Sequence, residues 1–280
     1  IDGPGQLLAI IGTSTCHMIM SEKELAVPGI CGVVEDGILP GLFGYEAGQS
    51  AVGDCFAWYL DNCLPASVRE EAAREGKGLH AYLRERASRL RPGESGLLAL
   101  DWWNGNRSML NNANLSGVLV GMTLSTQPEE IYRSLIEATA FGTREIVESI
   151  EAQGIAINHI FACGGLSRKS NLVMQIFADV LEREIIVTGV TQTTAYGAAM
   201  YGMVAAGKAN GGYDTLDEAM QALSKPPYKV YRPNPQHKAA YDALFRDYRR
   251  LSAYFGSANK DLMVGLKQLK TMAVEQPSVI

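Results

Sequence analysis

The spacing of apolar and polar residues changes along the first part of the chain. Short apolar runs at residues 7–11 and 17–20 are separated by the small residues Gly-Thr-Ser-Thr, which predicts a β-hairpin with a tight turn. A third strand is predicted at residues 31–34, and a glycine-rich path follows it. The apolar spacing then becomes helical, so a helix is expected from about residue 49 to residue 62.

The rest of the chain combines helices with short strands. A charged segment at 68–90 predicts a surface helix, and apolar residues three to four positions apart from Pro128 to Ile150 predict a long central helix. The other expected elements are strands at 97–100, 159–163 and 185–188, and helices at about 171–181, 194–206 and 236–254. The order after the central helix predicts a doubly wound α/β fold with a parallel strand pair.

Composition narrows the classes of function. The 280 residues are 47% hydrophobic and carry a net charge of -5, which is enough apolar material for one or two folded domains. No apolar stretch is long enough to cross a bilayer, so we expect a soluble chain without a membrane partner. With 25 basic and 30 acidic side chains, a nucleic-acid partner is not expected. The five cysteines show no C-x-x-C spacing, so we expect reduced thiols, a cytoplasmic location and no metal site.

Two glycine-containing turns are candidates for binding an anion. Gly12 and Thr13 lie between the first two predicted strands, where backbone N–H groups and a hydroxyl can hold a terminal phosphate; the alternative is an ordinary hairpin turn. Gly164 and Gly165 follow a strand and precede a helix, at the end of the sheet where ligands of doubly wound folds collect. The alternative there is a plain strand-to-helix turn, and neither G-x-G-x-x-G nor a P-loop is present.

Three charged residues outside the predicted helices need a separate explanation. Glu46 lies among glycines, where a long acidic side chain has no evident core role, so binding of a ligand hydroxyl and a structural role stay equally open. Asp101 and Arg107 share one loop. Arginine suits carboxylate or phosphate binding, but a structural pair between Asp101 and Arg107 that anchors the loop is the favoured interpretation.

Four segments taken together resemble the C-terminal half of the FGGY carbohydrate kinases. They are residues 12–17 (GTSTCH), 44–54 (GYEAGQSAVGD), 100–107 (LDWWNGNR) and 164–169 (GGLSRK). The resemblance covers residues 7 to about 254 in order. The Glu-Ala-Gly-Gln-Ser and Asp-Trp-x-Asn-Gly-x-Arg blocks are most similar to the family members that phosphorylate L-ribulose.

The resemblance implies an α/β fold of the actin-like ATPase (ribonuclease H-like) type. The chain would be the C-terminal half of a two-domain sugar kinase, with a nucleotide-binding domain at residues 1–255 and a peripheral tail at 256–280. It also implies roles for single residues. The γ-phosphate of ATP would be held by Gly12 and by Thr13, which is the catalytic candidate, and the sugar by Glu46. The residues implied to contact the rest of the nucleotide are Gly53, Gly164, Gly165 and either Ser170 or Asn171.

The implied reaction is ATP- and Mg²⁺-dependent phosphorylation of a ketopentose, L-ribulose to L-ribulose 5-phosphate, in L-arabinose catabolism. The general-base Asp of the family would lie upstream of Ile1 in a missing N-terminal domain, so this chain is expected to be a fragment that is inactive alone, and Asp2 is not expected to be the base. Two alternatives stay open: a kinase of the same family for another polyol or ketose, and a non-catalytic actin-like nucleotide-binding module. A homodimer is also left open.

Overall fold

The computed structural model describes residues 1–30 and 32–275 of the chain. Cys31, at the start of the third predicted strand, and residues 276–280 of the predicted tail lie outside the described residues. The elements in chain order are β1 (Gln6–Ile11), β2 (Thr15–Ser21), β3 (Gly32–Glu35), β4 (Phe43–Gln49), α1 (Gly53–Asn62), α2 (Ala66–Arg74), α3 (Leu79–Ala87), β5 (Leu98–Leu100), β6 (Val118–Val120), α4 (Pro128–Ala152), β7 (His159–Cys163), α5 (Gly165–Lys169), α6 (Asn171–Leu181), β8 (Ile185–Val187), α7 (Thr193–Ala206), η1 (Lys208–Asn210), α8 (Leu216–Leu223), β9 (Lys229–Tyr231), η2 (Pro235–His237), α9 (Lys238–Ala253), η3 (Tyr254–Ala258) and α10 (Lys260–Glu275).

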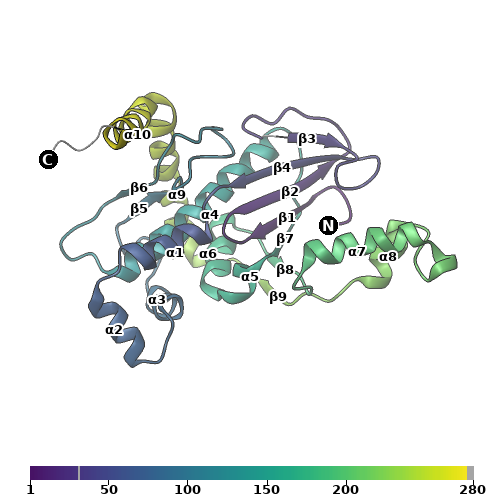
Figure 1. Ribbon diagram of the computed structural model, residues 1–280, viewed down its shortest axis with the longest axis horizontal. Coiled ribbons are helices and arrows are strands. Elements are labelled where there is room, and N and C mark those ends of the chain that lie inside the picture. Colours follow the sequence, from purple (N-terminus) through teal and green to yellow (C-terminus); the bar gives the residue numbers. More distant parts are fainter. Residues whose placement is uncertain (31, 276–280) are drawn as a thin grey trace.

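A mixed seven-stranded sheet forms the centre of the molecule (Figure 1). Its strand order is β3-β4-β2-β1-β7-β8-β9, with β1, β7 and β8 parallel to one another and the other neighbours antiparallel. The predicted hairpin of β1 and β2 and the predicted parallel pair of β7 and β8 are both confirmed. The carboxyl ends of β1 and β7 lie side by side, because Ile10 is in register with Cys163.

The long helix α4 is the centre of the hydrophobic core. It contacts α1, α3, α6, α9 and the strands β4 and β5, and most of its side chains are buried. Its start is specified locally, since Pro128 occupies the first turn and the Glu130 carboxylate accepts the backbone N–H of Gln127 at 2.6 Å. The chain leaves the helix at Gly154, which has a φ of 88°. The predicted central helix is therefore confirmed.

The glycine-rich path hides a strand that the sequence pattern did not indicate. Residues of β4 pair with β2 along the whole strand, and Tyr45, Ala47 and Gln49 point into the core at alternate positions. Gly48 is needed within this strand because a Cβ there would lie 2.4 Å from the carbonyl oxygen of Thr15. Since the strand extends to Gln49, the following helix begins at Gly53 rather than at the predicted position 49.

The segment predicted as one surface helix at 68–90 forms two helices, α2 and α3. Gly76, with a φ of 64°, and Gly78 lie in the turn that separates them. Tyr82, Leu83 and Ala87 of α3 are buried, and α3 packs against α4, so this segment contributes to the core as well as to the surface.

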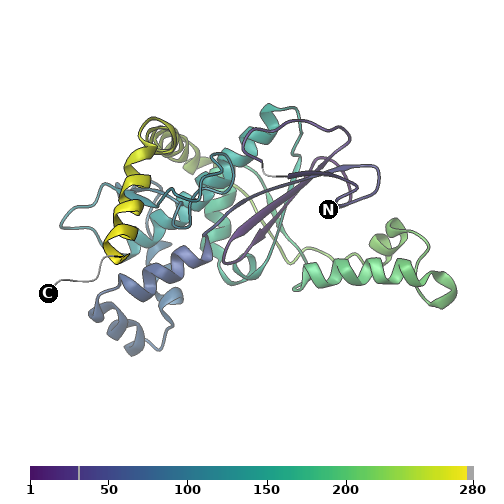
Figure 2. The same cartoon turned by 45° about the horizontal axis from the view of Figure 1, so that its top comes forward.

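Helices α4 and α6 cover one face of the sheet. They contact each other, α4 contacts β4, and α6 contacts β8 and β9. On the other face the side chains of Leu8, Met18 and Phe161 are half-buried. Helix α7, which a doubly wound fold would place over this face, extends away from the sheet together with α8, and none of its residues is buried (Figures 1 and 2). The double winding is thus observed on one face only.

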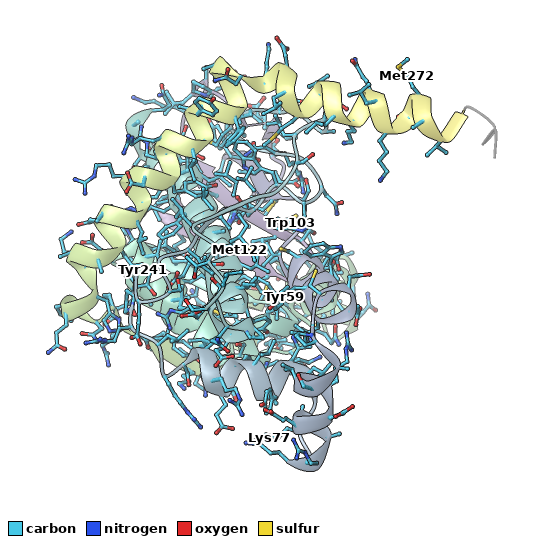
Figure 3. The ribbon with its side chains drawn as sticks, turned by 90° about the vertical axis from the view of Figure 1, so that its left-hand side faces the viewer. Tyr59, Lys77, Trp103, Met122, Tyr241 and Met272 are labelled. Atoms are coloured by element: carbon cyan, nitrogen blue, oxygen red, sulfur yellow. The ribbon has the colours of Figure 1, made fainter. Side chains whose placement is uncertain are left out.

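The segment after residue 255 is helical. Helix α10 follows η3 and is anchored near its start, where Met263 is buried and its Sδ accepts the backbone N–H of Ser116 at 3.4 Å. The Lys267 ammonium donates to the carbonyl oxygen of Ala113 at 2.7 Å. Figure 3 shows α10 continuing beyond the body of the molecule towards Met272, whose side chain is exposed. The predicted domain boundary at 255/256 stays a prediction.

Candidate functional site

The turn between β1 and β2 is docked onto the start of α1. The carbonyl oxygen of Gly12 accepts the N–H of Gly53 at 3.0 Å, and that of Thr13 accepts the N–H groups of Val52 at 2.8 Å and Asp54 at 3.2 Å. The first N–H groups of α1 are therefore used by the turn itself. The Thr13 side chain is exposed, and no hydrogen bond to its hydroxyl is found in the described part of the chain. The hydroxyl is thus presented to solvent from a fixed backbone.

Three predicted site glycines surround this turn, and two of them are explained by the backbone. A Cβ on Gly53 would lie 2.6 Å from the carbonyl oxygen of Gly12, and one on Gly164, whose φ is 91°, would lie 2.4 Å from that of Ile11. A Cβ on Gly165 would meet no heavy atom within 4 Å. Because Gly53 and Gly164 have no side chain, neighbouring backbone packs closely against them, whereas Gly165 faces open space.

Ser170 and Asn171 have other partners in the structure. The hydroxyl of Ser170 is buried and accepts the N–H of Val173 at 3.2 Å as the N-cap of α6. The side-chain oxygen of Asn171 accepts from the Tyr231 hydroxyl at 2.6 Å and from the Lys229 ammonium at 3.1 Å. Their contact with a nucleotide stays a prediction.

A hollow of about 490 Å³ lies between α1 and α3, close to these glycines. Its lining comprises Ala57, Leu60, Asp61, Gly78, Leu79, His80, Ala81 and Arg84. Ala57 is one turn along the helix that begins at Gly53. Arg84 donates to the carbonyl oxygen of Lys169 at 2.8 Å, which joins α3 to the end of α5. Burial lowers the pKa of His80, so its ring is neutral at pH 7. The hollow therefore offers a wall between α1 and α3 that is uncharged apart from Asp61 and Arg84.

Glu46 and Arg107 form an ion pair that connects β4 to the loop 101–112. An Nη2–H of Arg107 donates to Oε1 of Glu46, and an Nη1–H donates to the Sγ of Cys16 at 3.6 Å. The thiol of Cys16 in turn approaches the same Glu46 oxygen at 3.7 Å. The prediction that Asp101 pairs with Arg107 is therefore wrong, because Arg107 pairs with Glu46 instead. The sequence offered no signal for the observed pair, because Glu46 and Arg107 are 61 positions apart and belong to different elements.

Asp101 belongs to a buried polar network instead. Its Oδ2 accepts from the side-chain amide of Gln49 at 2.7 Å, and its Oδ1 accepts from the Tyr248 hydroxyl at 2.9 Å. The same amide donates to the carbonyl oxygen of Thr139 at 2.8 Å. The network fixes the start of the loop against β4, α4 and α9. Further along, the Ser108 hydroxyl accepts the N–H of Gly48 at 2.7 Å, so the loop is attached to β4 at several points.

Burial changes the acid–base behaviour of this region. It raises the pKa of the Asp101 carboxyl and lowers that of His17 on β2 to about 4. Burial, followed by the charge of Asp101, raises the pKa of Glu145 to about 7. His17 is therefore neutral at physiological pH, and Glu145 titrates near it.

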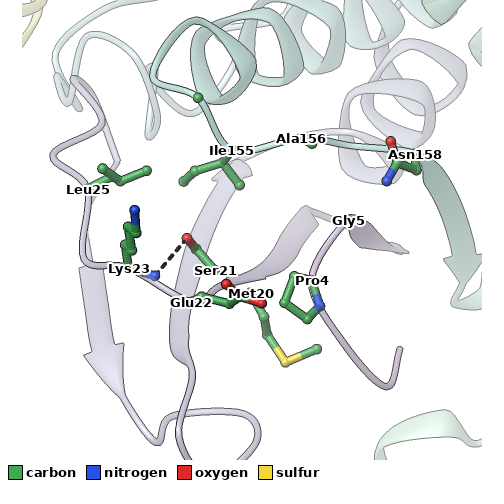
Figure 4. Close-up of a pocket in the computed structure, with 11 residues that line it drawn as sticks. Pro4, Gly5, Met20, Ser21, Glu22, Lys23, Leu25, Ile155, Ala156 and Asn158 are labelled. Carbon is green, nitrogen blue, oxygen red and sulfur yellow. Dashed lines mark hydrogen bonds between the residues drawn. The ribbon is translucent and has the colours of Figure 1, made fainter.

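The other end of the sheet carries a different hollow. Figure 4 shows this hollow of about 360 Å³, lined by Pro4, Met20, Lys23 and Ile155 among others, near the amino end of β1. Asp2 lies at this end, where its carboxylate accepts from the Gln6 side chain at 2.5 Å. The six residues of β1 place it about 20 Å from the Thr13 turn at roughly 3.3 Å per residue. Asp2 therefore lies at the opposite end of the sheet from the Thr13 turn and the glycines that surround it.

Residues 1–30 and 32–275 contain no group of three or more His, Cys, Asp or Glu side chains placed to hold a metal ion. Across the same residues, no helix is both long and apolar enough to cross a membrane.

Comparison with known proteins identifies the relatives of this chain. Residues 7–206 match the model of the FGGY family of carbohydrate kinases, C-terminal domain. The chain is 53% identical over 277 residues to a ribulokinase of Halalkalibacterium halodurans and 52% identical over 270 residues to one of Geobacillus thermodenitrificans. These alignments cover 99% and 96% of this chain but 49% and 48% of the relatives, so the chain spans about half the length of the curated relatives it matches.

A solved structure shares the fold. The xylulose kinase of Rhodospirillum rubrum superposes with a TM-score of 0.75 at 27% sequence identity, over 91% of this chain and 48% of that protein. The mixed sheet with its helices is thus the fold of the C-terminal half of such kinases, which is of the actin-like ATPase type expected from the sequence.

Proposed function

The chain belongs to the FGGY family of carbohydrate kinases, and from this membership we propose that it is the nucleotide-binding part of an enzyme that transfers the γ-phosphoryl group of ATP to O5 of L-ribulose. The observation that carries the proposal is the 53% identity to a ribulokinase over almost the whole chain. Such a reaction belongs to L-arabinose catabolism. We place it in the cytoplasm, where ATP is abundant.

The proposed nucleotide site extends from the Thr13 turn to the hollow between α1 and α3. The terminal phosphate would lie at Gly12 and Thr13, and the adenosine would pass Gly165, the glycine that faces open space. The base would then enter the hollow beside Ala57, where uncharged side chains suit a flat purine ring. A pre-formed turn that is already bonded to α1 needs little reorganisation when a phosphate binds.

Thr13 is the proposed catalytic residue of this chain. Its exposed hydroxyl would donate to the γ-phosphoryl group, on which charge is redistributed during transfer. The proton of the sugar hydroxyl must go to a base, and Asp2 is about 20 Å from Thr13 along β1, so we assign that role to an Asp outside residues 1–280 in a partner domain.

Glu46 is the proposed sugar ligand. Its side chain is 43% exposed, and a carboxylate can accept hydrogen bonds from polyol hydroxyls. Mg²⁺ would accompany ATP, and residues 1–30 and 32–275 supply no group of three or more His, Cys, Asp or Glu side chains that could hold it.

The proposal is tested with the full-length enzyme that contains this chain. A coupled assay with ATP and a panel of ketopentoses and polyols should give the highest kcat/KM with L-ribulose. A higher kcat/KM with another sugar would move the assignment to a different kinase of the family, and no transfer to any sugar would favour a non-catalytic module.

Variants at position 13 test the site. Thr13→Ala should lower kcat by roughly ten- to a thousand-fold with a smaller change in the KM for ATP, because one preorganised donor to the transferred group is lost. Thr13→Ser keeps the hydroxyl and should recover most of the rate. An unchanged kcat in Thr13→Ala would return the turn to a purely structural role.

A further inference from the structure

Glu46 is held on one side only. Arg107 and Cys16 both contact its Oε1, whereas no hydrogen bond or ion pair to Oε2 is found within residues 1–30 and 32–275. Two donors on one oxygen fix the plane of the carboxylate and leave the second oxygen free to accept from a ligand. The side chains of Glu46 and Arg107 are 43% and 34% exposed, so the pair is accessible from solvent.

The arginine is itself held in place by the loop that carries it. The adjacent residue, Ser108, is buried, and its hydroxyl accepts the N–H of Gly48 on the same strand as Glu46. A Cβ on Gly48 would lie 3.1 Å from Nη1 of Arg107, so the guanidinium packs directly over this glycine. The buried network around Asp101 fixes the start of the loop. A surface ion pair with this much support keeps its geometry better than two free side chains would.

We propose that Arg107 is a positioning residue for sugar binding, which holds the Glu46 carboxylate so that its second oxygen meets a hydroxyl of the ketopentose. The proposal rests on the proposed function, since it takes Glu46 as the sugar ligand. The loop 101–112 thereby has a role in substrate recognition. The buried network anchors the loop, and the loop places the Arg107 guanidinium against the Glu46 carboxylate. Arg107 contacts Glu46 and does not need to contact the sugar.

A double-mutant cycle in the full-length enzyme tests this role. Arg107→Met should raise the KM for L-ribulose about tenfold, the effect of losing one charge-assisted hydrogen bond in a partly exposed site, while the KM for ATP changes less than about twofold. In a Glu46→Gln background, the same substitution should change the KM for L-ribulose by less than about twofold, because the carboxylate that it positions is already gone. Arg107→Lys keeps the charge and should give an intermediate KM.

Each result has a defined meaning. The positioning role is overturned if Arg107→Met raises the KM for L-ribulose equally in the wild-type and Glu46→Gln backgrounds. It is also overturned if Glu46→Gln raises that KM while Arg107→Met in the wild-type background leaves it unchanged. If Glu46→Gln leaves that KM unchanged, it is the sugar assignment of Glu46 in the proposed function that fails. Arg91→Met, at an arginine whose side chain is 86% exposed, is the matched control and should leave both KM values unchanged.

Folding of the variants is followed by thermal melting. If Arg107→Met melts far below the wild type, the cycle is run with Arg107→Lys instead. The positioning role is then supported if Arg107→Lys raises the KM for L-ribulose in the wild-type background but not in the Glu46→Gln background. The same raised KM in both backgrounds, or an unchanged KM in Arg107→Lys, contradicts it.

Discussion

The Thr13 turn joins β1 to β2, and the loop 101–112 lies against β2 and β4, yet the two are attached by different means. The turn is held by backbone atoms: carbonyl oxygens of Gly12 and Thr13 accept N–H groups of α1, and Gly164 lets the end of β7 approach Ile11. The loop is held by side chains, chiefly those of Asp101 and Ser108, which are both buried. The backbone attachment is therefore disrupted by an added side chain at a glycine. The side-chain attachment is disrupted by the loss of a hydrogen-bond partner or by a change of charge.

The largest expected effect breaks the backbone attachment. Gly164→Ala should lower the free energy of unfolding by about 3 kcal/mol, because the new Cβ would lie 2.4 Å from a backbone oxygen at a φ of 91°. The matched control is Gly165→Ala at the next position, where nothing lies within 4 Å and the change should stay within about 1 kcal/mol. Urea-induced unfolding measures both. Equal losses in the two variants would show that close backbone approach does not distinguish these glycines.

A smaller effect breaks the polar attachment. Asp101→Asn should lower the free energy of unfolding by about 2 kcal/mol, since an amide nitrogen would replace one of the two oxygens that accept from Gln49 and Tyr248. Asp247→Asn removes a carboxylate that is 51% exposed and should cost less than about 0.5 kcal/mol. Urea unfolding again gives the comparison. A cost at Asp101 no greater than at Asp247 would mean that the network does not hold the loop.

The smallest effect depends on pH and belongs to the polar region alone. The pKa of Glu145 is raised from 4.5 to about 7 in the folded protein, so folded protein binds the proton more tightly and the free energy of unfolding falls as pH rises between those values. Glutamine cannot ionise. Glu145→Gln should therefore gain stability relative to the wild type from pH 5 to pH 8. The full pKa shift would give about 2.5 kcal/mol, and because the side chain is only partly buried we expect a gain on the order of 1 kcal/mol.

Unfolding at several pH values tests this assignment. The difference in the free energy of unfolding between variant and wild type isolates the contribution of Glu145. The lowered pKa of buried His17 makes stability rise with pH between about 4 and 6.5, but it does so equally in both proteins and cancels in the difference. Parallel stability curves for the two proteins would contradict a raised pKa at Glu145.

The parts of the fold that the sequence predicted well are those with a local signal. The boundaries of β7 and α6 agree with the prediction, and α4 begins at Pro128, because a run of apolar residues, a capping pattern and a helical period are all contained within a few turns. The family resemblance was also carried by short blocks, and the matched region of residues 7–206 agrees with it. The strand β4 was missed because glycines occupy positions where a strand pattern needs side chains.

Short-range patterns thus contain the order of strands and helices, the family and the list of candidate residues. They do not contain the partners of those residues. Glu46 meets Arg107 across 61 positions and Asp101 meets Tyr248 across 147, contacts that exist because the sheet and α4 bring distant segments together. Likewise, Gly53 and Gly164 look alike as ligand-binding glycines in the sequence, but the backbone that fills the space beside each comes from another part of the chain, and its position follows from the packing of the whole domain.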